Sequence, residues 1–471
     1  MRRGAAVPGM TLDDIFGGSP ELAALVREAG ALDDAARFRA LTTHVPRGAG
    51  AGALERAVRA CAAAFAERAG LADVPPPRWD AAPVFGAQQP YVDYYPAVLA
   101  KLDALETARP SFYAFADYVP LGSYPWLART QLPSVTAPDG LLHVHVHRAN
   151  GAERGKDLRF VSLPLLATLD DVRVKLVTAI KRTARVLARE DGAARFSEQD
   201  AFARLRSVLA HQREARARGR SAAEFNAIWS ARTFRELGFT IPLLSLSDLL
   251  AHDAVLPFVA ETLSAFVRQS ALVTESIGEV LARDAHGAVP FARKDTGHVP
   301  LALAGARDGR RRPLRAQRRG ADWWLLTAGG SDETNGAMNG ESFNVGRADA
   351  PALEELLRAL RGRWSPDVFV PIFLFRLGVS GIVSGRGSIR YSLVVAHVMR
   401  RLFGAPHPPN LLRSCAPAQS GPFVDALRAE RGDVPAAVRA TEPALIARLL
   451  HAPPEQIREE IAAAWRDGAP R

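Results

Sequence analysis

The sequence predicts an α/β protein: a Rossmann-like parallel-sheet core with inserted helical connecting segments and a short helical C-terminal tail. Three observations favour this class. A strand-like run, a helix and a second strand-like run follow one another over residues 83–115, which is the order of a βαβ unit. Apolar residues recur at helical spacing in two long blocks, 169–220 and 247–284. An apolar run at 365–383 then leads into a glycine-containing turn and a further helix.

The length of 471 residues exceeds the usual size of a single domain, so several parts are expected. Each predicted part differs from its neighbours in its periodicity. We predict an N-terminal helical segment packed on the core (1–80), a first half of the core (81–168), a helical insertion (169–290), a second half of the core with the glycine loop (291–415) and C-terminal helices (416–471).

In the first half, "PVFGAQQP" ends a predicted strand, a helix covers residues 95–108, and "PSFYAFADYVP" is a second, aromatic strand. Two alternating runs follow at 141–149 and 157–165, and we expect them to form a hairpin or an extension of the sheet. The segment 234–246, between the two long helical blocks, is expected to be a strand that returns to the core.

In the second half, residues 298–327 contain short strands around a hairpin turn at Asp308-Gly309. A polar loop at 329–346 and a helix at 350–364 come next. The apolar run at 365–383 fits either a buried strand or a helix–strand pair, and both interpretations stay open.

Composition limits the possible classes of function. The net charge is +10, which favours anionic ligands, but the basic residues are dispersed and interleaved with acids, so nucleic acid is not an expected partner. The two cysteines, Cys61 and Cys415, exclude a disulfide framework and a Cys-rich zinc site and fit a reducing cytoplasm. No apolar run reaches transmembrane length and no secretory signal is recognised, so we expect a cytoplasmic protein without a membrane partner.

The predicted strands end in polar residues where α/β proteins bind ligands, beyond the carboxyl ends of parallel strands. Gln88 and Gln89 follow the first strand, and their amides can hydrogen-bond a substrate from either side. Asp117 and Tyr118 follow the second strand, where a carboxylate can act as a general base or orient an ammonium group. The alternative is structural: the glutamines belong to a capped turn, and Asp117 caps a loop.

The stretch "SGRGSIRYS" lies between the apolar run and the next helix. Gly385 and Gly387 would let backbone N–H groups approach an anion, and Arg386 or Arg390 would add positive charge. The stretch lacks both the full GxGxxG pattern and the Lys-Ser/Thr of a P-loop, so an ordinary turn is the alternative interpretation.

One further group has metal-ligand chemistry. "HVHVH" places His143, His145 and His147 on one face of a predicted strand, where they form either a zinc site or a polar sheet face. Because no carboxylate or cysteine stands at nearby spacing, we assign no metal. The sequence shows no nucleophile elbow, no HExxH motif and no kinase motif. Ser414-Cys415 has no recognisable base beside it, and an inert thiol is the expectation for both cysteines.

Taken in order, these pieces resemble the cysteine-adding enzymes of bacillithiol synthesis, which join cysteine to glucosaminyl-malate. "FGAQQP" matches that family's "TGQQ"-type motif, Lys101 matches its lysine-bearing helix, and "FADY" stands at its acidic "EDHD"-type motif. Later, "DGRRRPL", "SPDV", "VSGRGSIRY" and "LFGAPHPP" follow in the family's order, the third being similar to its "VGGPGEIAY". The resemblance spans about residues 10–415.

The chain departs from the family at three places. The acidic, histidine-bearing loop is reduced to Asp117-Tyr118, Val370-Pro371 replaces an Arg-Pro, and the long C-terminal coiled coil is largely missing after Asn410. That coiled coil serves dimerisation in the family, so a homodimer remains an open expectation. The departures point to a changed substrate or a changed oligomer.

The resemblance implies a ligase-like enzyme that joins an amino acid, cysteine above all, to a small anionic acceptor. Gln88, Gln89 and Asp117 would be the catalytic group. The substrate-binding residues would be Lys101, Tyr118, Ser384, Gly385, Arg386, Gly387, Ser388, Arg390 and Tyr391. No ATP-grasp or adenylation motif is present, so the activating cofactor, ATP or another, stays unassigned. A non-catalytic ligand-binding or regulatory protein on the same scaffold is the second hypothesis, and a metal-dependent enzyme that uses the three histidines is the third.

Overall fold

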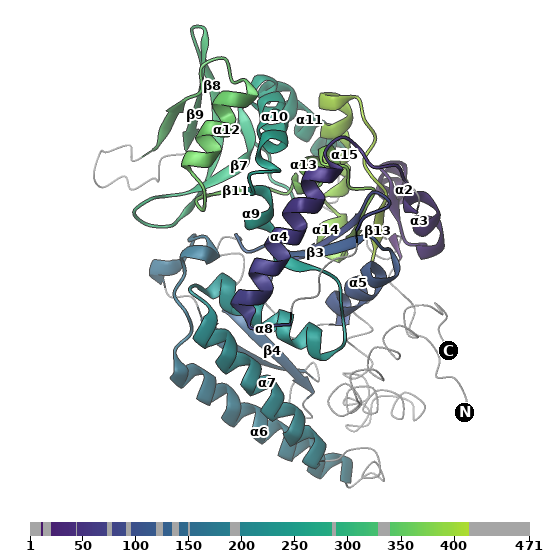
Figure 1. The fold of residues 1–471 in the computed structure, drawn as a ribbon, viewed down its shortest axis with the longest axis vertical. Helices are drawn as coiled ribbons and strands as arrows, with labels where there is room; N and C mark the ends of the chain where they lie inside the picture. Colours follow the sequence, from purple (N-terminus) through teal and green to yellow (C-terminus); the bar gives the residue numbers. More distant parts are fainter. Residues whose placement is uncertain are drawn as a thin grey trace.

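A computed structural model gives the fold of the chain (Figure 1). Two larger sheets and one two-stranded sheet are held together by helices. The structure describes residues 11–12, 20–43, 45–72, 78–90, 96–118, 126–133, 141–148, 151–188, 198–284, 289–327 and 340–413. The predicted C-terminal helices at 416–471 lie outside these residues, as do Ser414 and Cys415.

The centre of the molecule is a six-stranded sheet in which every pairing is parallel, and it confirms the predicted α/β class. Its strands are short and almost entirely buried, as expected for parallel strands that are covered on both faces. In spatial order they are β1 (Ala31–Leu32), β13 (Asn410–Leu412), β12 (Gly381–Ser384), β2 (Val84–Gln88), β3 (Ser111–Phe115) and β6 (Leu243–Ser245). Strand β1 comes from the N-terminal part, which we predicted to be entirely helical.

The predicted βαβ unit is present. Strands β2 and β3 are neighbours, and α5 (Pro96–Thr107) connects them. Gly86 lets this helix lie close to the sheet, because a Cβ at that position would stand 2.7 Å from the Cδ1 of Leu105. The N-terminal helices pack around the same sheet and are α2 (Pro20–Glu28), α3 (Ala35–Thr42) and α4 (Ala51–Ala69).

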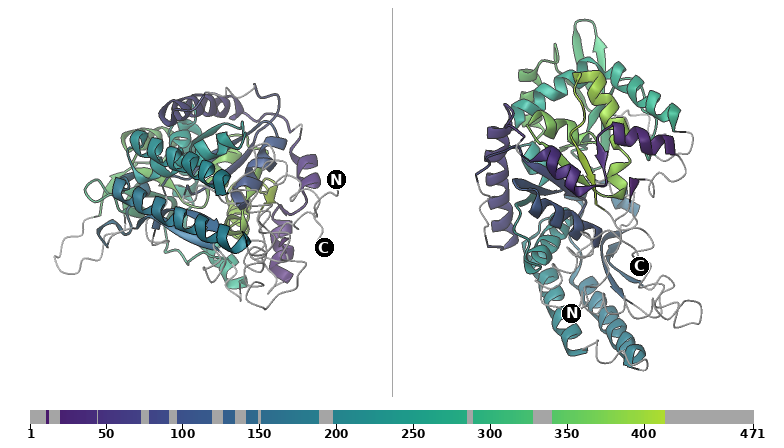
Figure 2. Two further views of the ribbon diagram at one scale, coloured as in Figure 1. Left: turned by 90° about the horizontal axis from the view of Figure 1, so that it is seen from below. Right: turned by 90° about the vertical axis from the view of Figure 1, so that its right-hand side faces the viewer.

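The predicted helical insertion (169–290) divides between two places, and its last helices, at 256–283, pack against strand 298–304. Its first part forms an elongated arm at the other end of the molecule (Figures 1 and 2). It contains α6 (Leu166–Ala188), α7 (Glu198–Arg218) and α8 (Ala222–Glu236). Beside these helices lies an antiparallel pair formed by β4 (Trp126–Pro133) and β5 (Leu141–Arg148), and a short 3₁₀ turn, η1 (Gly151–Glu153), follows. As predicted, the segment after α8 returns to the core, where β6 joins β3.

The expected pairing of residues 141–149 with 157–165 is wrong. Strand β5 pairs with β4, and the second segment begins with a 3₁₀ turn, η2 (Leu158–Phe160). Asp157 caps this turn, because its carboxylate accepts the backbone N–H of Arg159 at 3.1 Å and binds the guanidinium of the same residue. Such a local side-chain interaction competes with strand pairing.

A five-stranded antiparallel sheet occupies the opposite end (Figure 1). In spatial order its strands are β10 (Ser342–Asn344), β9 (Asp322–Thr327), β8 (Arg311–Arg319), β7 (His298–Ala304) and β11 (Trp364–Pro366). The predicted turn at Asp308-Gly309 joins β7 to β8, with Gly309 at φ +65°. Helices α10 (Leu256–Arg268) and α12 (Ala350–Ala359) lie beside this sheet. In the sequence, α9 (Leu246–Leu250) precedes α10 and α11 (Ser270–Arg283) follows it.

The apolar run at 365–383 fits the second of the two open interpretations, the helix–strand pair, with the end of β11 before it. It ends β11, forms the short helix α13 (Val370–Arg376) and then enters β12. Pro371 stands in the first turn of α13, where a missing N–H is tolerated, and Gly378 at φ +90° follows its end. After β12 come α14 (Arg386–Ile389) and α15 (Ser392–Phe403). None of the described helices is long and apolar enough to cross a membrane.

Candidate functional site

The structure brings the predicted loops to one edge of the parallel sheet. Strand β2 lies between β12 and β3, with Gln88 opposite Phe115 and Gly86 opposite Val383. Because the three strands are parallel, the segments after their carboxyl ends emerge side by side. The glutamine pair, the segment with Asp117 and the glycine loop therefore share this edge, which we call the carboxyl edge.

Lys101 is the most unusual residue at the carboxyl edge. Its side chain is 1% exposed, and its Nζ donates to Oε1 of Gln88 at 2.6 Å and approaches the carbonyl of Ala87 at 3.4 Å. Gly385 covers it: a Cβ on that glycine would lie 2.9 Å from Cε and 3.0 Å from Nζ of Lys101. Gln88, Lys101 and Gly385, three predicted site residues from separate segments of the chain, thus lie together.

Burial lowers the pKa of Lys101 from 10.5 to about 8. Within the described ranges, no carboxylate lies within ion-pair distance of Nζ, and only carbonyl oxygens compensate its charge. An ammonium group held in this way is an uncompensated buried cation, which favours an anionic ligand.

The sequence carries a signal for this burial that we did not use. Lys101 stands in a stripe with Val98, Leu102 and Leu105, which are i−3, i+1 and i+4 to it and face the core. A lysine inside the apolar stripe of a helix is expected to be buried and therefore to need a function or a partner.

The glycine loop begins at the end of β12. Ser384 is buried and its carbonyl accepts the backbone N–H of Arg413 at 2.7 Å, whereas Gly387 and Ser388 are exposed. Arg390 is half-buried, and its Nε is shielded from solvent and has no hydrogen bond to any residue that the structure describes. Tyr391 packs edge-on against Phe291, with ring centroids 6.1 Å apart. The side chain of Arg386 lies outside the described part of the structure.

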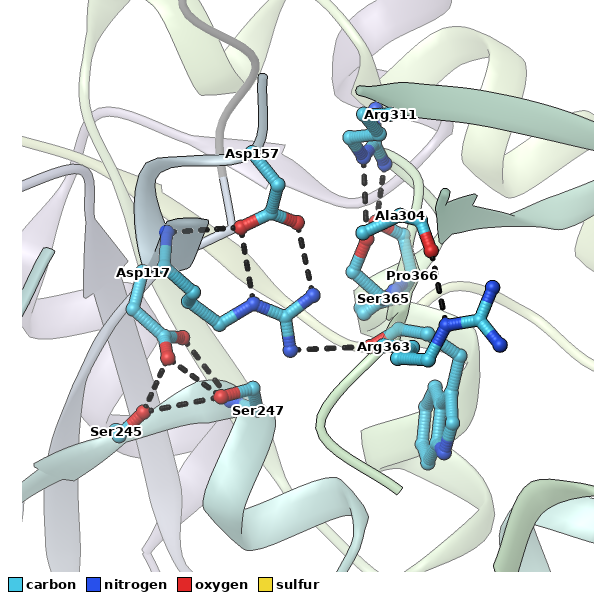
Figure 3. Close-up of polar contacts among 11 residues, drawn as sticks. Asp117, Asp157, Ser245, Ser247, Ala304, Arg311, Arg363, Ser365 and Pro366 are labelled. Atoms are coloured by element: carbon cyan, nitrogen blue, oxygen red, sulfur yellow. Dashed lines mark hydrogen bonds and ion pairs between the residues drawn. The ribbon is translucent and has the colours of Figure 1, made fainter. Parts of the chain in front are cut away.

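Asp117 is buried, and hydrogen-bond donors surround its carboxylate (Figure 3). The Oδ2 atom accepts the hydroxyls of Ser245, at 2.6 Å, and of Ser247, and Oδ1 accepts the backbone N–H of Ser247 at 3.1 Å. Burial raises the pKa of Asp117, while the charge of Arg159 and the two serines oppose that rise. Asp117 thus ties the end of β3 to the start of α9, as in the structural alternative; its role as a base stays a prediction.

The remaining predicted residues of these two loops lie nearby. Tyr118 is buried, with the guanidinium carbon of Arg311 5.9 Å from its ring centroid, and burial raises the pKa of its phenol. Gln89 is half-buried just beyond β2 and has no side-chain hydrogen bond to the residues that the structure describes. Of the glutamine pair, only Gln88 contacts Lys101.

Sequence reasoning missed a layer of arginines between the carboxyl edge and the antiparallel sheet (Figure 3). Arg159 forms a two-pronged ion pair with Asp157, at 2.9 and 2.8 Å, and donates to the carbonyl of Trp364 at 3.2 Å. Arg311 donates to Ser365 Oγ at 3.1 Å and to the carbonyl of Pro366 at 2.8 Å. Arg159 thus ties η2 to β11, and Arg311 ties β8 to β11. Part of the signal was present in "DGRRRPL" and "SPDV", which we used only for the resemblance.

A second missed group combines Lys294, His298 and Asp367. The Oδ2 atom of Asp367 lies 3.7 Å from Lys294 Nζ and 3.7 Å from His298 Nε2. His298 is 4% exposed, and within the described ranges its Nε2 has no hydrogen-bond partner. Lys294 and His298 stand four residues apart, but Asp367 comes much later in the chain, in "SPDV". No local spacing pattern therefore joins the three residues.

The three histidines of "HVHVH" lie on β5, with His143 opposite Gln131 and His145 opposite Arg129. The side chains of His143, His145 and His147 lie outside the described part, so the metal hypothesis is not tested there. Among the side chains that are described, no three His, Cys, Asp or Glu residues form a group that could hold a metal ion.

Asp117→Ala is expected to lower the free energy of unfolding by about 2 kcal/mol, because the partly buried N–H of Ser247 and the buried hydroxyl of Ser245 lose their acceptor. Asp117→Asn should cost less, since it keeps one oxygen.

Because burial raises the pKa of Asp117 above its usual 3.8, the native state binds the proton more tightly, and wild-type stability falls as the pH rises through that pKa. Urea unfolding from pH 4 to 8 should show this fall for wild type but not for Asp117→Asn; equal pH profiles would contradict it.

The chain was also compared with known proteins. Neither the protein families nor the curated proteins with which it was compared include a match. The fold and the residues at the carboxyl edge are therefore what bears on function.

Proposed function

We propose that this protein is a ligase-like enzyme that joins an amino acid, cysteine first among the candidates, to a small acidic acceptor in thiol or specialised-metabolite biosynthesis. The observation that carries the proposal is the buried ammonium group of Lys101 between Gln88 and Gly385. The resemblance described above supplies the reaction type. In this proposal the enzyme works in the cytoplasm, and its oligomeric state, homodimer or monomer, is to be measured by light scattering.

Lys101 also orients the amide of Gln88. A protonated lysine can only donate, so the amide oxygen of Gln88 faces Nζ, and its NH₂ group is turned away from Lys101. An acceptor carboxylate or phosphate at the glycine loop would meet this amide and the charge of Lys101 together. Hydrogen bonds to charged groups are the stronger class, and they would select an acidic acceptor.

The proposed division of roles follows the two sides of the carboxyl edge. Lys101, Gln88 and the glycine loop bind the acceptor, with Tyr391 beside them. Tyr118 and the arginine layer lie toward the antiparallel sheet, where the amino acid would approach. Forming an amide bond from an amine and a carboxylate releases water and needs an activated carboxyl group. ATP is the energy source to test first: it would convert the reacting carboxylate into a mixed anhydride, from which the attacking amine displaces phosphate or AMP.

The direct test is to incubate the protein with ATP, L-cysteine and a panel of acidic acceptors and to detect the joined product by mass spectrometry. Gly385→Ala should reduce product formation at least about tenfold, because the new Cβ would lie 2.9 Å from Lys101 Cε and the buried side chain has little room to move. Gly278→Ala on α11 is the matched control, since no atom of the described residues lies within 4 Å of the point where its new Cβ would stand and the position is outside the predicted site, so activity should persist. Equal activity of the two variants would count against the proposal.

The contacts of Asp117 favour a second candidate, a non-catalytic ligand-binding or regulatory protein on the same scaffold. Three donors occupy the carboxylate that the first hypothesis uses as a base. Calorimetric binding of an acidic acceptor such as L-malate that Gly385→Ala weakens, with no product under any of the conditions above, would favour this candidate over the enzyme.

A further inference from the structure

The group formed by Lys294, His298 and Asp367 lies where two antiparallel strands meet. Asp367 directly follows β11, and His298 begins β7. Because Ser365 pairs with Ala302 and Pro366 with Leu301, the end of β11 lies beside the start of β7. The backbone N–H of Asp367 donates to the carbonyl of Pro300 at 2.9 Å and fixes this end. The carboxylate is thus held by the sheet rather than by a loose loop.

The polar contacts within this group are incomplete. Both the ammonium of Lys294 and the imidazole of His298 stop 3.7 Å from the same oxygen of Asp367, beyond hydrogen-bond distance. The Nε2 atom of His298 is fully shielded and has no hydrogen-bond partner among the residues that the structure describes. A buried polar atom without a partner calls for an explanation, and an additional group that bridges His298 and Asp367 would satisfy both.

The charges of the three residues are complementary to a zwitterion. Burial opposes the ionisation of Asp367, but the nearby charges of Arg311 and Lys294 outweigh it and lower the pKa of Asp367, so it is a carboxylate at neutral pH. Burial lowers the pKa of His298 to about 4, so its ring is neutral and can accept a hydrogen bond once the proton sits on Nδ1. Lys294 keeps about a quarter of its side chain exposed and can turn toward a ligand.

The group also lies next to the predicted site. Lys294 sits over the ring of Phe291 at 4.8 Å, and Phe291 contacts Tyr391 at the glycine loop. On the other side, the charge of Arg311 acts on Asp367, and its guanidinium lies over Tyr118. The three residues therefore stand between the two loops that end β3 and β12.

We propose that Asp367, His298 and Lys294 form the binding subsite for a zwitterionic α-amino acid. The ammonium of the amino acid binds between the Oδ2 of Asp367 and the Nε2 of His298, and its carboxylate binds Lys294. This inference rests on the proposed function, in which one substrate is an amino acid. It assigns that substrate to the antiparallel sheet and leaves the glycine loop to the acidic acceptor.

The test is calorimetric titration of the full-length protein with L-cysteine and its two truncated analogues, cysteamine and 3-mercaptopropionate. Asp367→Asn should weaken L-cysteine and cysteamine at least about tenfold, because a charge-assisted hydrogen bond is lost, and should not weaken 3-mercaptopropionate. Lys294→Met should weaken L-cysteine and 3-mercaptopropionate but not cysteamine. Lys294 is partly exposed, so this variant keeps the test valid if Asp367→Asn fails to fold.

Asp295→Asn is the matched control, because Asp295 is a carboxylate on the same segment that is 68% exposed and faces Arg315 instead. It should bind all three ligands as wild type does. L-cysteine binding that neither Asp367→Asn nor Lys294→Met changes, or no L-cysteine binding to wild type, would overturn the subsite. The subsite and the enzyme can fail separately. If the three ligands bind with the predicted pattern but no product forms, the ligase is rejected and the subsite is kept. If Asp367→Asn forms product at the wild-type rate, the subsite is rejected and the ligase is kept.

Discussion

Lys101→Met is expected to weaken binding of an acidic acceptor, probed with L-malate, by about 10- to 100-fold. The substitution keeps most of the side-chain volume but removes the charge that is buried against Gln88 and Gly385. A hydrogen bond to a charged group contributes about 1.5–3 kcal/mol, which gives that range of affinity. Calorimetry at pH 7 measures the effect, and product formation should fall in parallel.

The same substitution should change stability with a distinctive pH dependence. The pKa of Lys101 is about 8 in the folded protein and 10.5 when the side chain is exposed, a difference that corresponds to about 3 kcal/mol. Between these pH values the unfolded chain binds the proton and the native one releases it, so wild-type stability rises with pH. Relative to Lys101→Met, wild type should therefore gain up to about 3 kcal/mol from pH 8 to 10.5.

The control for both effects is Lys175→Met, which removes a lysine that is 55% exposed on α6. Neither L-malate affinity nor the pH dependence of unfolding should change in that variant. If Lys101→Met bound L-malate as wild type does, the acceptor would have to bind elsewhere, and the role of the glycine loop would be rejected.

Gly297→Ala is expected to lower the free energy of unfolding by about 3 kcal/mol. Gly297 has φ +85°, and a Cβ there would lie 2.4 Å from the carbonyl oxygen of Ala316, which the rigid strand β8 holds in place. Left-handed backbone strain and the steric conflict add together. The carbonyl of Gly297 also accepts the N–H of Ala316 at 2.7 Å, so the contact between this turn and β8 would be disturbed. Thermal or urea unfolding measures the loss.

Gly320→Ala separates the two causes. Gly320 also has a left-handed backbone, at φ +63°, but no atom lies within 4 Å of where its Cβ would stand. Strain alone should cost about 1 kcal/mol in that variant. An equal loss in both variants would show that the close approach to Ala316 contributes nothing.

The sequence predicted those parts of the fold that local patterns determine. Apolar runs interrupted by a helix gave β2, α5 and β3, and Asp308-Gly309 marked the turn between β7 and β8. The sequence did not predict the partner of β5. Alternation of apolar and polar residues identifies a strand but does not show which other strand it pairs with. The turn after Asp157 was missed because a side chain–backbone hydrogen bond decides it.

The candidate site was predicted in part for the same reason. Residues that directly follow a strand, such as Gln88 and Asp117, can be found once the strands are recognised. Whether Gln88 meets Lys101, and whether Asp117 meets Ser245, depends on packing between segments that the sequence does not relate. Asp367 and His298 come together only through the antiparallel pairing of β11 with β7.

The order of the strands in the parallel sheet has a consequence for how the chain is made. On the ribosome β2, β3 and β6 are complete long before β12 and β13, which pair with β2 and with each other. Until residue 412 has been synthesised, β2 presents an open edge and β1 lacks its partner β13. Non-local pairing of this kind slows folding and exposes strand edges to other chains. The nascent protein is therefore most prone to aggregation just before β12 and β13 are synthesised and pair with β2 and β1. Chaperones would protect the unpaired side of β2 during that interval.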